Sequence, residues 1–103
     1  MDTGTFEKVV ESMLRKAQSV LINKEKEYAT EDRLHNFRVA AAFQQCTMEQ
    51  ALFGFLVKQL VSISDMCKSG EAYAYDIWDE KIGDSINYLL LLRAVVADRN
   101  QSL

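Results

Sequence analysis

The sequence contains no proline, and its 103 residues include only four glycines. β-Sandwiches and β-barrels need many tight turns, and these two residue types supply them, so the composition disfavours both folds. Long hydrophobic runs are also missing. The longest apolar stretches, 51–57 and 86–97, are shorter than the roughly 20 residues that cross a bilayer. We therefore expect an all-α protein without a membrane segment.

An excess of basic residues is missing too. Twelve Lys and Arg residues stand against fifteen Asp and Glu residues, for a net charge of −3, which gives no general attraction to nucleic acid or to an anionic membrane. The single histidine and the distant Cys46 and Cys67 do not form a zinc ligand set. The polar first residues do not resemble a secretory signal. We expect a cytoplasmic protein with reduced thiols, and neither nucleic acid nor membrane as a partner.

The size of the chain fits one domain. Hydrophobic residues make up 49% and charged residues 26% of the sequence, which is typical of a folded protein. A mass of 11.8 kDa corresponds to a folded surface of roughly 5,900 Å². We expect residues 1–103 to form a single helical domain.

The first half of the chain predicts two helices. Hydrophobic residues recur every three or four positions over 6–21, the spacing of one helical face. Thr3 or Thr5 is placed to cap this helix, which should end near residue 26. Within the polar segment 23–38, Thr30 can start a shorter helix that runs through residue 43.

The second half predicts two longer and more hydrophobic helices. Thr47 and Gln50 fit the capping-box pattern, so a helix should run from residue 48 to about 68, with Gly70 ending it. Asp76 can cap the last helix, which should run to about residue 99. The four consecutive leucines at 89–92 point in every direction around it. The expected fold is a four-helix, bundle-like protein with two long antiparallel apolar helices. A lone monomer would leave some leucines in water, so we also expect a homo-oligomer.

Polar residues interrupt each of the two apolar helices along one line. The first line contains Lys58, Ser62 and Asp65; the second contains Asp76, Glu80, Asp84 and Asn87. Both follow helical spacing. Because a short loop makes the helices antiparallel, we expect the two lines to face each other across one groove.

Three interpretations of this groove are open. Lys58 and Asp84 can form a structural ion pair that fixes the register of the hairpin. Asp65, Glu80 and Asp84 can hold Mg²⁺, which prefers carboxylate and phosphate oxygens. Alternatively, Lys58 can meet a phosphate while Asp84 or Asn87 meets a base or a ribose.

The polar segment supplies further candidate ligand-binding residues. Tyr28, Arg33, His35, Asn36 and Arg38 offer an aromatic face, two guanidinium groups and an imidazole within eleven residues. Guanidinium groups bind phosphate in a bidentate manner, and aromatic rings stack on bases. The alternative is a solvated turn with its charges on the surface.

Three segments carry a family resemblance, and their sequences are KEKEYATEDRLHNFRVAA, ALFGFLVKQLVSISDM and IWDEKIGDSINYLLLLRAVV. They resemble small all-α proteins of bacteriophages and prophages that are grouped as nucleotide-modification-associated. The segment EKIGDSINYLLLL is also similar, more distantly, to the second acidic helix of the MazG-type nucleoside triphosphate pyrophosphohydrolases. That similarity implies Mg²⁺ at Glu80 and Asp84.

Three functional hypotheses follow. In the first, a phage-type oligomer in the bacterial cell binds a nucleotide or a nucleotide-derived signal and sequesters it to counter host defence. Its ligand-binding residues would be Tyr28, Arg33, His35, Asn36, Lys58, Asp84 and Asn87. In the second, the protein is a Mg²⁺-dependent pyrophosphohydrolase. In the third, it inhibits a host factor by protein–protein contact.

Overall fold

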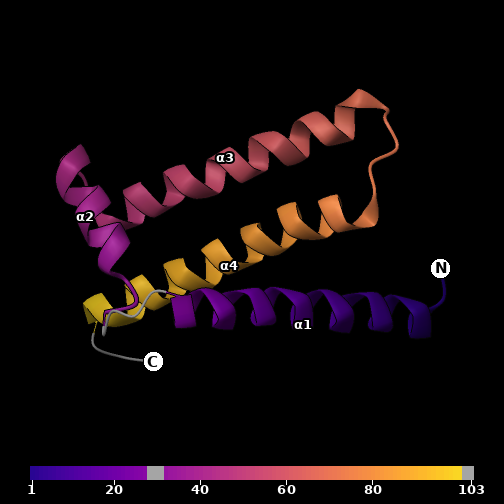
Figure 1. Cartoon of the computed structure of the whole chain (residues 1–103), viewed down its shortest axis with the longest axis horizontal. Helices are drawn as coiled ribbons and strands as arrows, with labels where there is room; N and C mark the ends of the chain where they lie inside the picture. The colour runs from indigo at the N-terminus through magenta and orange to yellow at the C-terminus, as the bar shows by residue number, and fades with distance from the viewer. Residues whose placement is uncertain (28–31, 101–103) are drawn as a thin grey trace.

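The computed structural model describes residues 1–27 and 32–100. In this part of the chain all regular structure is helical, which confirms the all-α prediction. The four helices, shown in Figure 1, are α1 (Thr3–Glu27), α2 (His35–Gln44), α3 (Met48–Ser69) and α4 (Tyr75–Asn100).

The three long helices form a single layer with α4 in the middle. Figure 1 shows α3 and α4 as an antiparallel hairpin, with α1 on the other side of α4 and running in the same direction as α4. α4 packs against both α1 and α3, whereas α1 and α3 share no packing contact in the described residues. α2 packs against the N-terminal end of α3. The helix α4 therefore presents one side to α1 and another to α3.

The ends of α3 follow the sequence signals. The Thr47 side chain accepts a hydrogen bond from the backbone N–H of Gln50 at 3.1 Å, and the Gln50 side chain accepts one from the N–H of Thr47 at 3.0 Å. Gly70 follows the helix with a φ of 72°, a left-handed conformation that glycine adopts without steric cost. The predicted capping box and terminator are both confirmed.

The starts of α1 and α4 differ from the prediction by a residue or more. α1 begins at Thr3, and the carboxylate of Asp2 accepts a hydrogen bond from the N–H of Thr5 at 2.7 Å. Asp2 thus caps α1, and the assignment of the cap to Thr3 or Thr5 was wrong. α4 begins at Tyr75, so Asp76 lies in its first turn, where its charge favours the helix dipole.

The start of α2 is also later than predicted. Thr30 lies outside the described residues, and residues 32–34 form a turn before the helix begins at His35. The Asp32 carboxylate accepts a hydrogen bond from the N–H of Leu34 at 3.0 Å and another from Arg38 Nε at 2.7 Å. These two bonds hold the turn against the first turn of α2. An aspartate that bonds the backbone two residues on is a common turn former.

The best-packed part of the core lies where α2 meets the N-terminal end of α3 and the C-terminal end of α4. Leu34, Phe37, Leu52 and Val95 form one buried cluster, and Leu52 and Val95 are 0% exposed. Nearby, the ring of Phe55 stacks on Tyr88 with centroids 6.2 Å apart. This region is called the packed end below.

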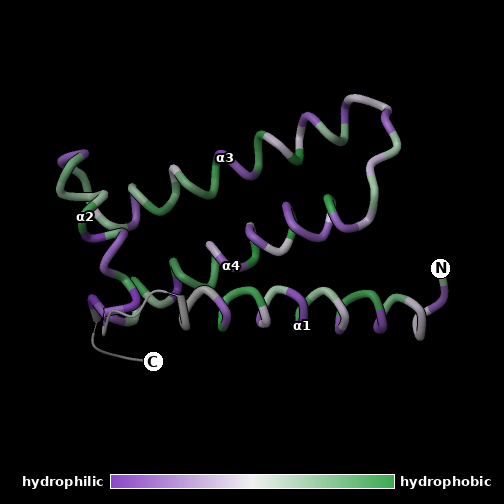
Figure 2. Tube along the Cα trace, viewed as in Figure 1, coloured by the Kyte–Doolittle hydropathy of each residue, from purple (hydrophilic) through white to green (hydrophobic). Residues whose placement is uncertain are grey.

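Many large hydrophobic side chains remain exposed on the single chain. Figure 2 shows hydrophobic stretches along α3 and along the C-terminal half of α4, yet only Ala51, Leu52, Leu56 and Met66 of α3 are buried. Leu89 and Leu90 are about half exposed, as expected for a leucine run in a monomer. None of the helices in the described residues is long and apolar enough to cross a membrane.

Candidate functional site: a carboxylate-lined groove between α1 and α4

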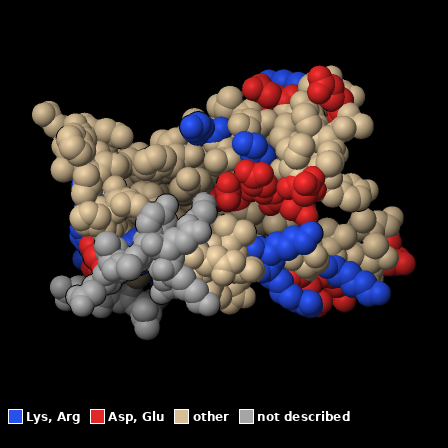
Figure 3. Space-filling model, in the orientation of Figure 1, with Lys and Arg blue, Asp and Glu red and all other residues tan. Residues whose placement is uncertain are grey.

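The acidic side of α4 faces α1 and forms a groove of about 570 Å³ with it. The groove is lined on α1 by Lys16, Ala17, Ser19 and Val20, and on α4 by Asp76, Asp79, Glu80, Gly83 and Asp84. In Figure 3, acidic side chains gather over the middle of the molecule, with basic side chains beside them.

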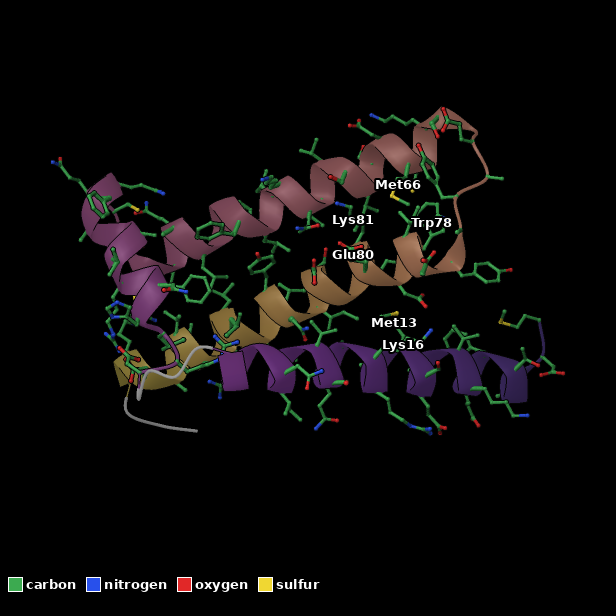
Figure 4. All side chains as sticks on the ribbon, in the orientation of Figure 1. Met13, Lys16, Met66, Trp78, Glu80 and Lys81 are labelled. Atoms are coloured by element: carbon green, nitrogen blue, oxygen red, sulfur yellow. The ribbon has the colours of Figure 1, made fainter. Side chains whose placement is uncertain are left out.

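Helical spacing explains why these acids point to α1. Asn87 hydrogen-bonds to Ala17 of α1, and Glu80 and Asp84 precede it by seven and three positions, which places all three on one side of α4. Small residues allow α1 and α4 to approach. Ala17 is only 2% exposed, and a Cβ atom at Gly83 would lie 3.2 Å from Met13 Cε. Figure 4 shows Met13 projecting from α1 toward α4.

The groove carries an excess of negative charge. Lys16 Nζ lies 2.5 Å from Asp79 Oδ2, and these side chains are 57% and 30% exposed. Within the described residues, Asp76, Glu80 and Asp84 form no ion pair. Four carboxylates therefore share one ammonium group. Such an arrangement attracts cations, and repels a free phosphate.

A smaller cavity of about 30 Å³ adjoins the groove at Asp84. Its walls are Leu21, Arg33, Asp84, Asn87, Tyr88 and Leu91. Asn87 is only 6% exposed, and its Nδ2 donates a hydrogen bond to the backbone carbonyl of Ala17 at 2.8 Å. Its Oδ1 is buried and has no hydrogen-bond partner within the described part of the chain. Asn87 thus joins α4 to α1 and offers one acceptor that is not satisfied.

The structure brings together some of the predicted ligand-binding residues. Arg33, Asp84 and Asn87 line the same small cavity, although Arg33 is 54 positions from Asn87 in the sequence. His35 and Asn36 are exposed in the first turn of α2 and line neither cavity. Tyr28 lies outside the described residues.

The prediction that the polar lines of α3 and α4 face each other was wrong. Lys58 and Asp65 are exposed on α3 and line neither cavity, whereas Glu80 and Asp84 line the groove with α1. Among the described residues, Lys58 makes no ion pair with Asp84. The physical reason is that α4 packs on two helices, and its α3 side is taken by residues such as Tyr88, whose ring stacks on Phe55.

The predicted metal ligands are only partly brought together. Glu80 and Asp84 share the groove, but Asp65 is exposed on α3 and does not line it. The described residues contain no group of three or more His, Cys, Asp and Glu side chains placed to hold one ion.

The contribution of α1 to the groove was not predicted from the sequence. Lys16 belonged to the polar face of an ordinary amphipathic helix, and Ala17 to its apolar face, so neither stood out. The available signal was Gly83, which lies inside a helix between Glu80 and Asp84. Glycine in a helix interior costs about 1 kcal/mol relative to alanine, and often marks a close approach of another element.

Comparison of the chain with protein-family models, with curated proteins and with solved structures finds no match.

Proposed function

We propose that the protein binds a nucleotide or a nucleotide-derived signal in the groove between α1 and α4, with a divalent cation between the carboxylates and the phosphates. The observation that carries this proposal is the unsatisfied acceptor on Asn87. Leaving a buried acceptor without a partner costs about 1–3 kcal/mol, and native proteins rarely do so. A ligand that donates a hydrogen bond would remove this cost.

The neighbours of Asn87 favour a nucleotide as that ligand. Asn87 Oδ1 and the Asp84 carboxylate both accept hydrogen bonds, so together they suit the amino and imino groups of a base or the hydroxyls of a ribose. Arg33 lines the same cavity and offers a guanidinium group of the kind that binds phosphate. The larger groove next to it has the volume of a small-molecule site.

The negative charge of the groove explains the cation. Phosphates would not enter a groove with four carboxylates unless a cation neutralised them. Mg²⁺ binds proteins through one or two carboxylates and takes its remaining ligands from water and phosphate oxygens. Glu80 and Asp84 suit this role because they lie one helical turn apart on one side of α4.

The same pair of carboxylates supports a second candidate function, a Mg²⁺-dependent nucleoside triphosphate pyrophosphohydrolase. Glu80 and Asp84 line one groove, as that activity requires of metal ligands. Asp65 and Lys58 have no part in this version, because they line neither cavity. Release of pyrophosphate from nucleoside triphosphates distinguishes the enzyme from the binding protein.

Isothermal titration calorimetry against a panel of nucleoside mono-, di- and triphosphates and cyclic or ADP-ribose-type signals tests the proposal, with and without Mg²⁺. We expect binding of at least one compound that requires Mg²⁺. Asn87→Leu, which keeps the branching at Cγ but removes the acceptor, should weaken binding at least about tenfold.

Ser85→Ala is the matched control. Ser85 is as buried as Asn87 and two positions away on α4, but its hydroxyl donates to the backbone carbonyl of Lys81 instead of facing the groove. Ser85→Ala should bind as the wild type does. Absence of binding across the whole panel, or equal losses in both variants, would contradict the proposal.

A further inference from the structure

A hydrophobic face of the α3–α4 hairpin is left without a partner, and we propose that a second copy of this chain covers it. Five large side chains define this face, each between 36% and 54% exposed: Phe53, Val57, Leu60, Ile82 and Leu89. We call them the hairpin face. The inference does not rest on the binding of nucleotides.

The spacing of these residues places them on one side of the hairpin. On α3, Phe53 and Val57 each directly follow a buried leucine, Leu52 or Leu56. On α4, Leu89 directly follows Tyr88, whose ring stacks on α3. One step along a helix is a rotation of about 100°. Because α3 and α4 are antiparallel, the same step turns both sets toward the same side.

The exposed area of the chain has the size of a missing interface. A folded monomer of this mass exposes roughly 5,900 Å², whereas this chain exposes 7649 Å². The excess is roughly 1,700 Å², and obligate homodimers bury about 1,000–2,500 Å² per copy. The radius of gyration also indicates an extended chain. It is 15.7 Å, against roughly 13 Å for a compact domain of this length.

The chemistry of the hairpin face favours a second copy over other partners. None of its five residues is charged, and Lys58 lies one further step around α3, at its edge. A nucleic acid or an anionic membrane would require basic residues. In a two-fold dimer each copy offers the same patch to the other, and an uncharged apolar patch meets its own copy without repulsion. Two hairpins would then form a second helical layer, which a single layer needs to bury its apolar side.

This arrangement leaves the groove accessible. Ile82 follows Glu80 by two positions and Leu89 follows Asn87 by two, which is a rotation of about 200° around α4. Ile82 and Leu89 therefore lie on the side of α4 opposite to Glu80 and Asn87. The dimer would carry two grooves that open outward, away from its interface.

Sedimentation equilibrium of the wild-type protein at micromolar concentration is the first test. We expect a particle of twice 11.8 kDa. The double variant L60A/L89A should raise the dissociation constant of the dimer at least about a hundredfold, because four leucine side chains leave the interface. Both leucines are about half exposed in the single chain, and alanine favours helices, so the variant should keep its helical circular dichroism.

Phe43→Ala is the matched control, since Phe43 is the most exposed phenylalanine of the described residues, at 85%, and lies on α2, away from the hairpin face. It should leave the dissociation constant unchanged. A wild-type protein that stays monomeric while folded would overturn the proposal. So would an L60A/L89A variant that associates as tightly as the wild type, because self-association would then use another surface.

Discussion

The two ends of α4 are packed in different ways. At the packed end, α4 meets α2 and α3 through Leu52 and Val95, which are completely buried. Along the groove, α4 meets α1 around Ala17, while carboxylates and a cavity of about 570 Å³ take the place of apolar contacts. Burial of apolar area stabilises a fold, whereas a binding site needs accessible polar groups. We infer that the packed end supplies most of the stability, and that the groove is kept open at a cost in stability.

Leu52→Ala is expected to have the largest effect and tests the first half of this comparison. Leu52 is 0% exposed and belongs to the core cluster. Its truncation should lower the free energy of unfolding by about 2–5 kcal/mol. Urea unfolding at one fixed protein concentration measures it. Leu14→Ala on α1, where the side chain is 53% exposed, should cost less than about 1 kcal/mol. Equal losses at the two sites would contradict the comparison.

Thr47→Ala removes the capping box at the packed end. Its hydroxyl satisfies the N–H of Gln50, which otherwise lacks a partner within the helix. We expect the free energy of unfolding to fall by about 1 kcal/mol, as measured by thermal or urea unfolding. Thr47→Ser keeps the hydroxyl, so it should retain nearly the wild-type stability. A loss as large in Thr47→Ser would show that the methyl group matters more than the cap.

The elements that could be predicted from sequence are those fixed by local chemistry. The start of α3 at Thr47 and its end at Gly70 follow from backbone hydrogen bonds within a few residues. The partner of the acidic line on α4 could not be predicted in this way. Glu80 and Asp84 have the same helical spacing whether they face α3 or α1, and only the packing of three helices decides between them. Helical spacing therefore identified the acidic line on α4 but not the helix that it faces.

The site residues that could be predicted from sequence are also those whose local pattern is unusual, whereas roles that depend on distant contacts could not be predicted. Asp84 and Asn87 were identified because they interrupt an apolar helix, and they do line a cavity. Lys58 interrupts an apolar helix as well, yet it is exposed, because α3 has no helix covering that side in the single chain. Lys16 could not be identified, since its contact with Asp79 joins residues 63 positions apart.

Alanine substitutions at two glycines, one in the hairpin and one at the groove, should change the free energy of unfolding by smaller amounts. A Cβ atom at Gly54 in α3 would meet nothing within 4 Å, whereas one at Gly83 would lie 3.2 Å from Met13 Cε. Gly54→Ala should therefore raise the free energy of unfolding by about 0.5–1 kcal/mol. Gly83→Ala should raise it by less, because Met13 must move away. In a Met13→Ala background the Gly83→Ala gain should recover, and equal gains in both backgrounds would show that α1 does not approach α4 closely there.

The smallest expected effect is the pH dependence at the turn before α2. A hydrogen bond from Arg38, and then one from the N–H of Leu34, hold the pKa of Asp32 below its ordinary value of 3.8. Because folding lowers this pKa, the carboxylate contributes stability above pH 3.8 and loses that contribution as the pH falls through the folded-state pKa. Asp32→Asn should flatten the acid limb of stability against pH below 3.8, while leaving the groove unaffected. Carboxyl NMR titration measures the pKa of Asp32 directly. A rise toward 3.8 in an Arg38→Gln variant would identify the guanidinium as the main cause. An unchanged pKa in that variant would assign the shift to the turn backbone instead.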